Sequence, residues 1–154
     1  MEANKHKLMV TQMDKKLTAF TSIANVITPI KGWIHSIRKA LKMSEKQLAK
    51  RMGISQPALH LLESREKEKT ISLKKMEEIG NALDLRFVYG FAPKTSLSQM
   101  IEEKARLAAK KIVFTTSLNM SLEEQKVSEQ RIKESVDELT KELIRTMPRF
   151  LWDD

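Results

Sequence analysis

The sequence predicts a mostly α-helical protein with one short β-strand and a C-terminal pair of helices. Apolar residues recur at spacings of three and four in several segments, which is the period of amphipathic helices. Ser96 with Gln99, and Ser121 with Glu124, form capping boxes that mark the first turns of the two C-terminal helices. Residues 85–91 instead alternate apolar and other side chains, as a strand does.

Composition restricts the class of protein. The 154 residues suffice for one domain, or for a small domain with an extension. The absence of cysteine excludes disulfides, thiolate metal sites and thiol nucleophiles, and it suits a reducing cytoplasm. No apolar run approaches the roughly 18 residues of a membrane span, and the N-terminal lysines are not followed by the apolar stretch of a signal peptide. We therefore expect a cytoplasmic protein that makes no membrane contact.

The N-terminal segment is predicted to form an amphipathic helix and a linker. The apolar face of this helix holds Met9, Met13, Leu17 and Phe20. Residues 21–31 lead to Gly32 and read as the linker. We accordingly divide the chain into residues 1–31, a central domain at 32–84 and a C-terminal extension at 85–154.

The central domain contains two short helices joined by a tight turn, within SEKQLAKRMGISQPALHLLE at residues 44–63. Ser44 and Ser55 each provide the side-chain oxygen that caps the first turn of a helix. Pro57 suits the first turn of the second helix, where no backbone donor is needed, and Gly53 provides the left-handed turn residue. The inward faces hold Leu48, Ala49, Met52, Ile54, Leu59 and Leu62. This spacing is that of a helix-turn-helix.

One further helix is predicted on each side of this motif. The first spans residues 32–42, and the second begins at Ser72. Gly80 inside the second helix costs about 1 kcal/mol against alanine. Its presence predicts close packing against another backbone segment.

The central residues resemble the DNA-binding domain of the lambda-repressor and Cro superfamily, the XRE type of helix-turn-helix. From about Gly32 to Met120 the chain is similar to a narrower group, the mobile mystery protein A family. The segments GWIHSIRKAL and LRFVYGFAP carry the narrower resemblance. It implies a small DNA-binding protein of a bacterial mobile element, typically encoded beside a partner protein that contains a Fic domain.

The positive charge is concentrated in the part of the chain that holds the helix-turn-helix. The net charge is +8; residues 1–95 hold 18 Lys and Arg against 9 Asp and Glu, whereas residues 96–154 hold 10 against 11. Between Lys31 and Arg51 there are seven basic residues and a single acid, Glu45. A basic run is usually a solvated helix face, but its coincidence with this motif favours contacts with DNA phosphates.

We expect the second helix of the motif to read base edges in the major groove of double-stranded DNA. Gln56 lies in its first turn, where an amide can bond both N6 and N7 of adenine, although a solvated polar residue is the alternative. The superfamily often has Gln in base contact at this position. The expected base contacts are Gln56, Pro57, Ala58, His60 and Leu61.

Phosphate contacts are expected from residues around the motif. They are Lys31, Ser44, Lys46, Gln47, Lys50, Ser55, Ser64 and Arg65. Gln47 has another explanation, because it completes a capping box with Ser44. The superfamily often has a phosphate-binding Gln at the position of Glu45; a carboxylate would repel phosphate, so we expect Glu45 to interact with the helix N-terminus instead.

The extension is predicted to mediate dimerisation or partner binding. The strand at 85–91 needs a second strand, which lies either elsewhere in this chain or in another subunit. The last helix carries an apolar seam with heptad-like spacing. The seam consists of Ile132, Val136, Leu139, Leu143 and Met147. These helices either pack on each other and on the N-terminal helix or pair across a two-fold axis, and we expect a homodimer.

We do not expect an enzyme, a cofactor or a metal site. The three histidines, His6, His35 and His60, are scattered, and the four glycines form no phosphate-binding cluster. The expected function is a sequence-specific transcriptional regulator, an autoregulating repressor. The narrower resemblance adds an antitoxin-like role beside a Fic-domain protein, although the closest match to a Fic-inhibiting motif, Ser64 to Glu68, is followed by lysine. The alternative is a protein-interaction adaptor in which the helix-turn-helix is only a scaffold.

Overall fold

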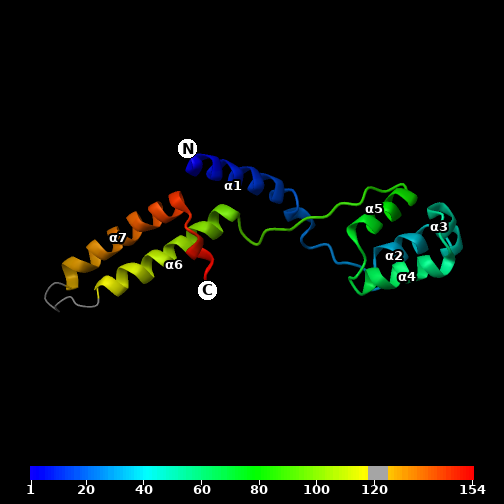
Figure 1. Cartoon of the computed structure of the whole chain (residues 1–154). Coiled ribbons are helices and arrows are strands. Elements are labelled where there is room, and N and C mark those ends of the chain that lie inside the picture. Colours follow the sequence, from blue (N-terminus) through cyan, green and yellow to red (C-terminus); the bar gives the residue numbers. More distant parts are fainter. Residues whose placement is uncertain (118–124) are drawn as a thin grey trace. The chain divides into compact units, whose positions relative to one another are not determined.

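A computed structural model of the chain describes residues 1–117 and 125–154 (Figure 1). It contains two compact units. One comprises residues 25–90 and is called the helix-turn-helix unit below; the other comprises residues 1–24 and 91–154 and is called the hairpin unit. None of the helices within the described residues has the length and apolarity that crossing a membrane requires.

Four short helices form the helix-turn-helix unit. They are α2 (Trp33–Ala40), α3 (Glu45–Met52), α4 (Gln56–Lys67) and α5 (Leu73–Ala82). Their inward side chains form one core of Ile34, Leu48, Ala49, Leu59, Leu62, Ile79 and Leu83. The motif residues predicted to face inward therefore share one core, in which Met52 and Ile54 are partly buried.

Local chemistry sets the ends of these helices. Ser44, Ser55 and Ser72 are the N-caps of α3, α4 and α5, and each side chain accepts a hydrogen bond from a backbone N–H in the first turn. Gly53 ends α3 in the left-handed conformation, with φ of 68°. The predicted caps and turn residue are thus confirmed.

A carboxylate from α4 caps α2. The backbone N–H groups of Trp33 and Ile34 donate to Oε1 and Oε2 of Glu66, at 2.6 and 2.9 Å. Gly32 precedes them with φ of 88°, and a Cβ at this residue would lie 2.8 Å from Oε2 of Glu66. Glycine is therefore required both by the backbone conformation and by the close approach of this carboxylate.

The predicted strand at residues 85–91 is wrong, since residues 1–117 and 125–154 form no strand. This segment begins as the turn that ends α5: Asp84 has φ of 57°, and the Leu85 N–H donates to the Gly80 carbonyl at 2.8 Å. A Cβ at Gly80 would lie 3.0 Å from the Leu85 carbonyl, which is the close packing expected of this glycine. Alternating apolar residues do not form a strand without another strand to pair with.

Three α-helices and two short 3-10 helices form the hairpin unit within the described residues. They are α1 (Glu2–Thr18), η1 (Thr21–Ile23), α6 (Leu97–Ser117), α7 (Gln125–Thr146) and η3 (Arg149–Trp152). Figure 1 shows α6 and α7 side by side and antiparallel. Their shared core consists of Ala105, Ala109, Val136, Leu143 and Leu151, with Ile132 and Leu139 packed against it. Most of the predicted seam therefore packs within this chain. The capping box predicted at Ser121 and Glu124 lies outside the described residues.

The N-terminal helix is joined to α6 by one carboxylate. Asp14 Oδ1 accepts from the Leu97 N–H at 2.6 Å, and Oδ2 accepts from the N–H and the hydroxyl of Ser98 at 3.2 and 2.7 Å. These are unpaired donors at the start of a helix, which a carboxylate satisfies well. No residue of α1 is itself buried.

Candidate nucleic-acid interface

The outer surface of α4 carries the residues predicted to contact bases. Gln56, Pro57, His60 and Leu61 are exposed, whereas Ala58 is half-buried. Gln56 and His60 are four residues apart and therefore lie on one face of the helix, one turn from each other. The structure thus brings an amide, an imidazole and apolar groups together at the N-terminal end of one exposed helix.

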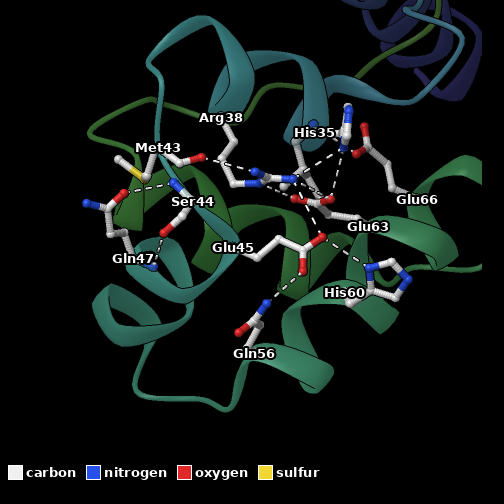
Figure 2. Close-up of polar contacts among 11 residues, drawn as sticks. His35, Arg38, Met43, Ser44, Glu45, Gln47, Gln56, His60, Glu63 and Glu66 are labelled. Carbon is white, nitrogen blue, oxygen red and sulfur yellow. Dashed lines mark hydrogen bonds and ion pairs between the residues drawn. The ribbon is translucent and has the colours of Figure 1, made fainter.

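Glu45, the first residue of α3, holds two of these side chains (Figure 2). Its Oε2 accepts from Gln56 Nε2 at 3.4 Å, and its Oε1 lies 3.1 Å from His60 Nδ1. The guanidinium of Arg38 lies on the same carboxylate, with Nη2 at 3.7 Å from Oε1. Glu45 therefore connects α2, α3 and α4 at the exposed end of the motif.

These contacts favour the ionised form of Glu45. The hydrogen bond with His60 is the main cause that lowers its pKa, and Gln56 and Arg38 lower it further against the opposing effect of desolvation. Glu45 lies in the first turn of α3, the position expected of a carboxylate that interacts with a helix N-terminus, and it also contacts side chains of α2 and α4. Sequence periodicity contains no signal for these contacts, because they cross the turn between separate helices.

A buried ion pair lies behind this carboxylate. Arg38 and Glu63 are 3% and 6% exposed, and they form a bidentate pair with Nε–Oε1 at 2.6 Å and Nη2–Oε2 at 3.1 Å. Arg38 Nη1 also donates to the Met43 carbonyl at 3.0 Å, and His35 Nδ1 lies 3.2 Å from Glu63 Oε2. Arg38 was counted in the basic run, yet it is an internal group that fixes α2 to α4.

The residues predicted to contact phosphate fall into two groups. The first group is exposed and basic: Lys31, Lys46, Lys50 and Arg65. The second group has hydroxyl or amide side chains: Ser44, Gln47, Ser55 and Ser64. Ser44 and Gln47 form the complete capping box, at 2.8 and 3.1 Å, and Ser55 accepts from the Ala58 N–H at 3.2 Å.

The carboxylates of α3 and α4 make contacts within the helix-turn-helix unit, whereas two lysines of α3 are exposed. Glu45, Glu63 and Glu66 bond to groups inside the unit. Lys46 and Lys50 are exposed and form no ion pair with another residue in the described part of the chain. The acids therefore stabilise the unit while these two lysines remain available to an anionic partner.

Residues 34–89 match a family model described as Helix-turn-helix. No curated protein matches the chain. No solved structure matches it either. The matched range contains α2 to α5, so the geometry and the family model define the same part of the chain. Residues 34–89 are therefore an XRE-type helix-turn-helix domain, the domain type of DNA-binding regulators.

Proposed function

We propose that this protein is a sequence-specific, cytoplasmic regulator of transcription that inserts α4 into the major groove of double-stranded DNA. In a helix-turn-helix, residues near the N-terminus of the second helix contact base edges while neighbouring residues contact the backbone. Gln56 and His60 lie at that end of α4, and Lys46 and Lys50 lie on the preceding helix.

The proposal rests mainly on the hydrogen bond by which Glu45 orients the exposed side chain of Gln56. Glu45 can only accept hydrogen bonds, so the amide nitrogen of Gln56 faces it, and the amide oxygen and second N–H remain for a partner. Adenine offers a donor at N6 and an acceptor at N7 in the major groove, which is the matching pair. The side chain is thus oriented for a base before DNA arrives.

We also propose a homodimer that represses its own operon, with the two copies of α4 one helical turn apart on the operator. The resemblance to the mobile mystery protein A family supports the autoregulation and a Fic-domain partner. The apolar seam of α7 packs on α6 within the same chain, so the seam no longer supports an interface between two subunits. Dimerisation would then require another surface of the chain.

Fluorescence anisotropy against salt concentration tests DNA binding. The full chain is titrated onto a labelled duplex from 50 to 200 mM salt. Contacts with about five to eight phosphates predict that log K falls with log salt at a slope near −5 to −7. A slope near zero would contradict the proposed function.

A further inference from the structure

The Glu45 cluster restricts how two neighbouring side chains present their hydrogen-bonding atoms. An ionised carboxylate accepts hydrogen bonds and donates none. The 3.1 Å contact from Glu45 Oε1 to His60 Nδ1 therefore places a proton on Nδ1. The 3.4 Å contact to Gln56 likewise places the amide nitrogen, and not the amide oxygen, toward Glu45.

The remaining ring nitrogen of His60 is the group left for DNA. The His60 side chain is 70% exposed, and His60 lies one turn beyond Gln56 on the exposed face of α4. With Nδ1 protonated, a neutral ring has a lone pair at Nε2 and accepts a hydrogen bond. A positively charged ring carries N–H at Nε2 and donates one.

The two forms fit different base edges in the major groove. An acceptor at Nε2 pairs with the amino groups of cytosine and adenine, whereas a donor at Nε2 pairs with O6 or N7 of guanine, O4 of thymine or N7 of adenine. Adenine therefore fits both forms of the ring, cytosine fits only the neutral form, and guanine and thymine fit only the charged form. Histidine is the side-chain type that ordinarily changes charge between about pH 5 and pH 8.

The charged side chains near the His60 ring come from α2, α3 and α4. Glu45 from α3 contacts it directly, and Arg38 from α2 reaches the same carboxylate at 3.7 Å. Glu63 of α4 and His35 of α2 contact the same Nη2 of Arg38, at 3.1 and 3.3 Å, and Glu63 balances its charge. In the described part of the chain, the carboxylate of Glu45 is thus the one charged group in direct contact with the ring.

We propose that Glu45 is a positioning residue for base readout, which fixes the Gln56 amide and the His60 ring so that the base selected at His60 depends on protonation of that ring. This inference rests on the proposed function and adds a second base-reading residue to it. Guanine or thymine is selected when the ring is charged, and cytosine when it is neutral.

Selection from a pool of randomised duplexes at pH 6 and at pH 8 tests this inference on the full chain. One position of the selected site should change from guanine or thymine at pH 6 to cytosine at pH 8. Anisotropy with two duplexes that differ only at that position should show a preference of about fivefold at each pH, with opposite sign.

Three variants distinguish a loss of base recognition by His60 from a loss of folding. H60A should abolish the pH-dependent preference while Gln56 continues to select its own base. E45Q should weaken the preference at pH 8, because an amide can donate to Nδ1 and so releases the other tautomer. H6Q, which changes an exposed histidine in the hairpin unit, should leave the preference unchanged.

Long-range ¹H–¹⁵N correlation spectra of the imidazole rings provide a readout that does not require DNA. The neutral His60 ring should carry its proton on Nδ1 in the wild type. A proton on Nε2 would overturn the positioning role of Glu45, as would a selected site that is identical at both pH values. If no duplex is enriched and binding is insensitive to salt, the proposed function itself fails and this inference fails with it.

Discussion

Both units use a carboxylate from one helix to cap the N-terminus of another, but the two caps have different surroundings. Glu66 caps α2 inside a unit whose helices also share the Arg38–Glu63 pair and a common apolar core. Asp14 caps α6 from α1, a helix that has no buried residue. The comparison indicates that α4 is held by an ion pair, an apolar core and a cap, whereas α1 buries no residue and is capped onto α6 by one carboxylate.

The cores of the two units also differ in the kind of side chain that they bury. In the helix-turn-helix unit, charged groups are buried next to the apolar core and are fully paired. Among the residues of the hairpin unit whose burial the structure describes, the buried side chains are apolar except for Thr140, whose hydroxyl donates to the Val136 carbonyl at 2.6 Å. Alanines at positions 105 and 109 are fully buried where α6 and α7 meet. The first core is therefore sensitive to loss of charge and the second to added volume.

The largest predicted effect follows from removal of Glu63. E63A leaves the buried Arg38 guanidinium without its partner, and we expect a loss of about 3–5 kcal/mol in the free energy of unfolding. Urea unfolding monitored by circular dichroism measures this loss. E68A, at an exposed position of the same sequence segment, is the control and should change stability by less than about 0.5 kcal/mol. Equal stability of E63A and E68A would contradict the role given to the ion pair.

A smaller effect is predicted for added volume in the hairpin unit. A109L introduces a large side chain where the buried surface of α6 meets α7, and overpacking should cost about 1–3 kcal/mol. K110L, at the next and exposed position, should have little effect on the free energy of unfolding. If A109L is as stable as K110L in thermal unfolding, the helices do not pack through this alanine.

The smallest effect concerns the attachment of α1 at low pH. The hydrogen bond from the Ser98 hydroxyl is the main cause that lowers the pKa of Asp14, and the backbone N–H groups of Leu97 and Ser98 add to it. Because this pKa is lower in the folded state, the cap stabilises the protein above the ordinary Asp pKa. The contribution is lost as the pH falls through the lowered value.

Hydrogen exchange at the Leu97 and Ser98 amides measures this contribution. In the wild type, protection should decrease as the solution is acidified below about pH 4. D14N should lack the pH-dependent part of this protection. Protection that is independent of Asp14 would show that other contacts hold α1 on α6.

The ends of the motif helices could be predicted from the sequence because they are determined locally. Ser44, Gly53 and Ser55 act on backbone groups within a few residues, so their types and spacing sufficed. The role of Glu45 could not be predicted in this way, because its partners Gln56 and His60 are 11 and 15 residues away across a turn. Its charge is the basis for expecting repulsion of phosphate, whereas its contacts with Gln56 and His60 are evident only from the structure.

The prediction for residues 85–91 failed for a related reason. Alternation describes which residues are apolar, but a strand also requires another strand. The segment instead begins as the capping turn of α5. The sequence did predict that a backbone segment packs closely against Gly80, and residues 85–87 provide it. Packing of the C-terminal helices on the N-terminal helix was one of two expected alternatives, but the cap that joins α1 to α6 had no sequence signal, since Asp14 and Leu97 are 83 residues apart.

Paired variants test most directly whether α4 reads bases while the surrounding lysines bind the DNA backbone. Anisotropy compares the full chain, Q56A and K50A on a selected duplex and on a shuffled duplex of equal length. We predict that Q56A loses roughly 1–3 kcal/mol on the selected duplex and almost nothing on the shuffled one, whereas K50A weakens both alike. Equal losses for Q56A on the two duplexes would contradict base reading by Gln56.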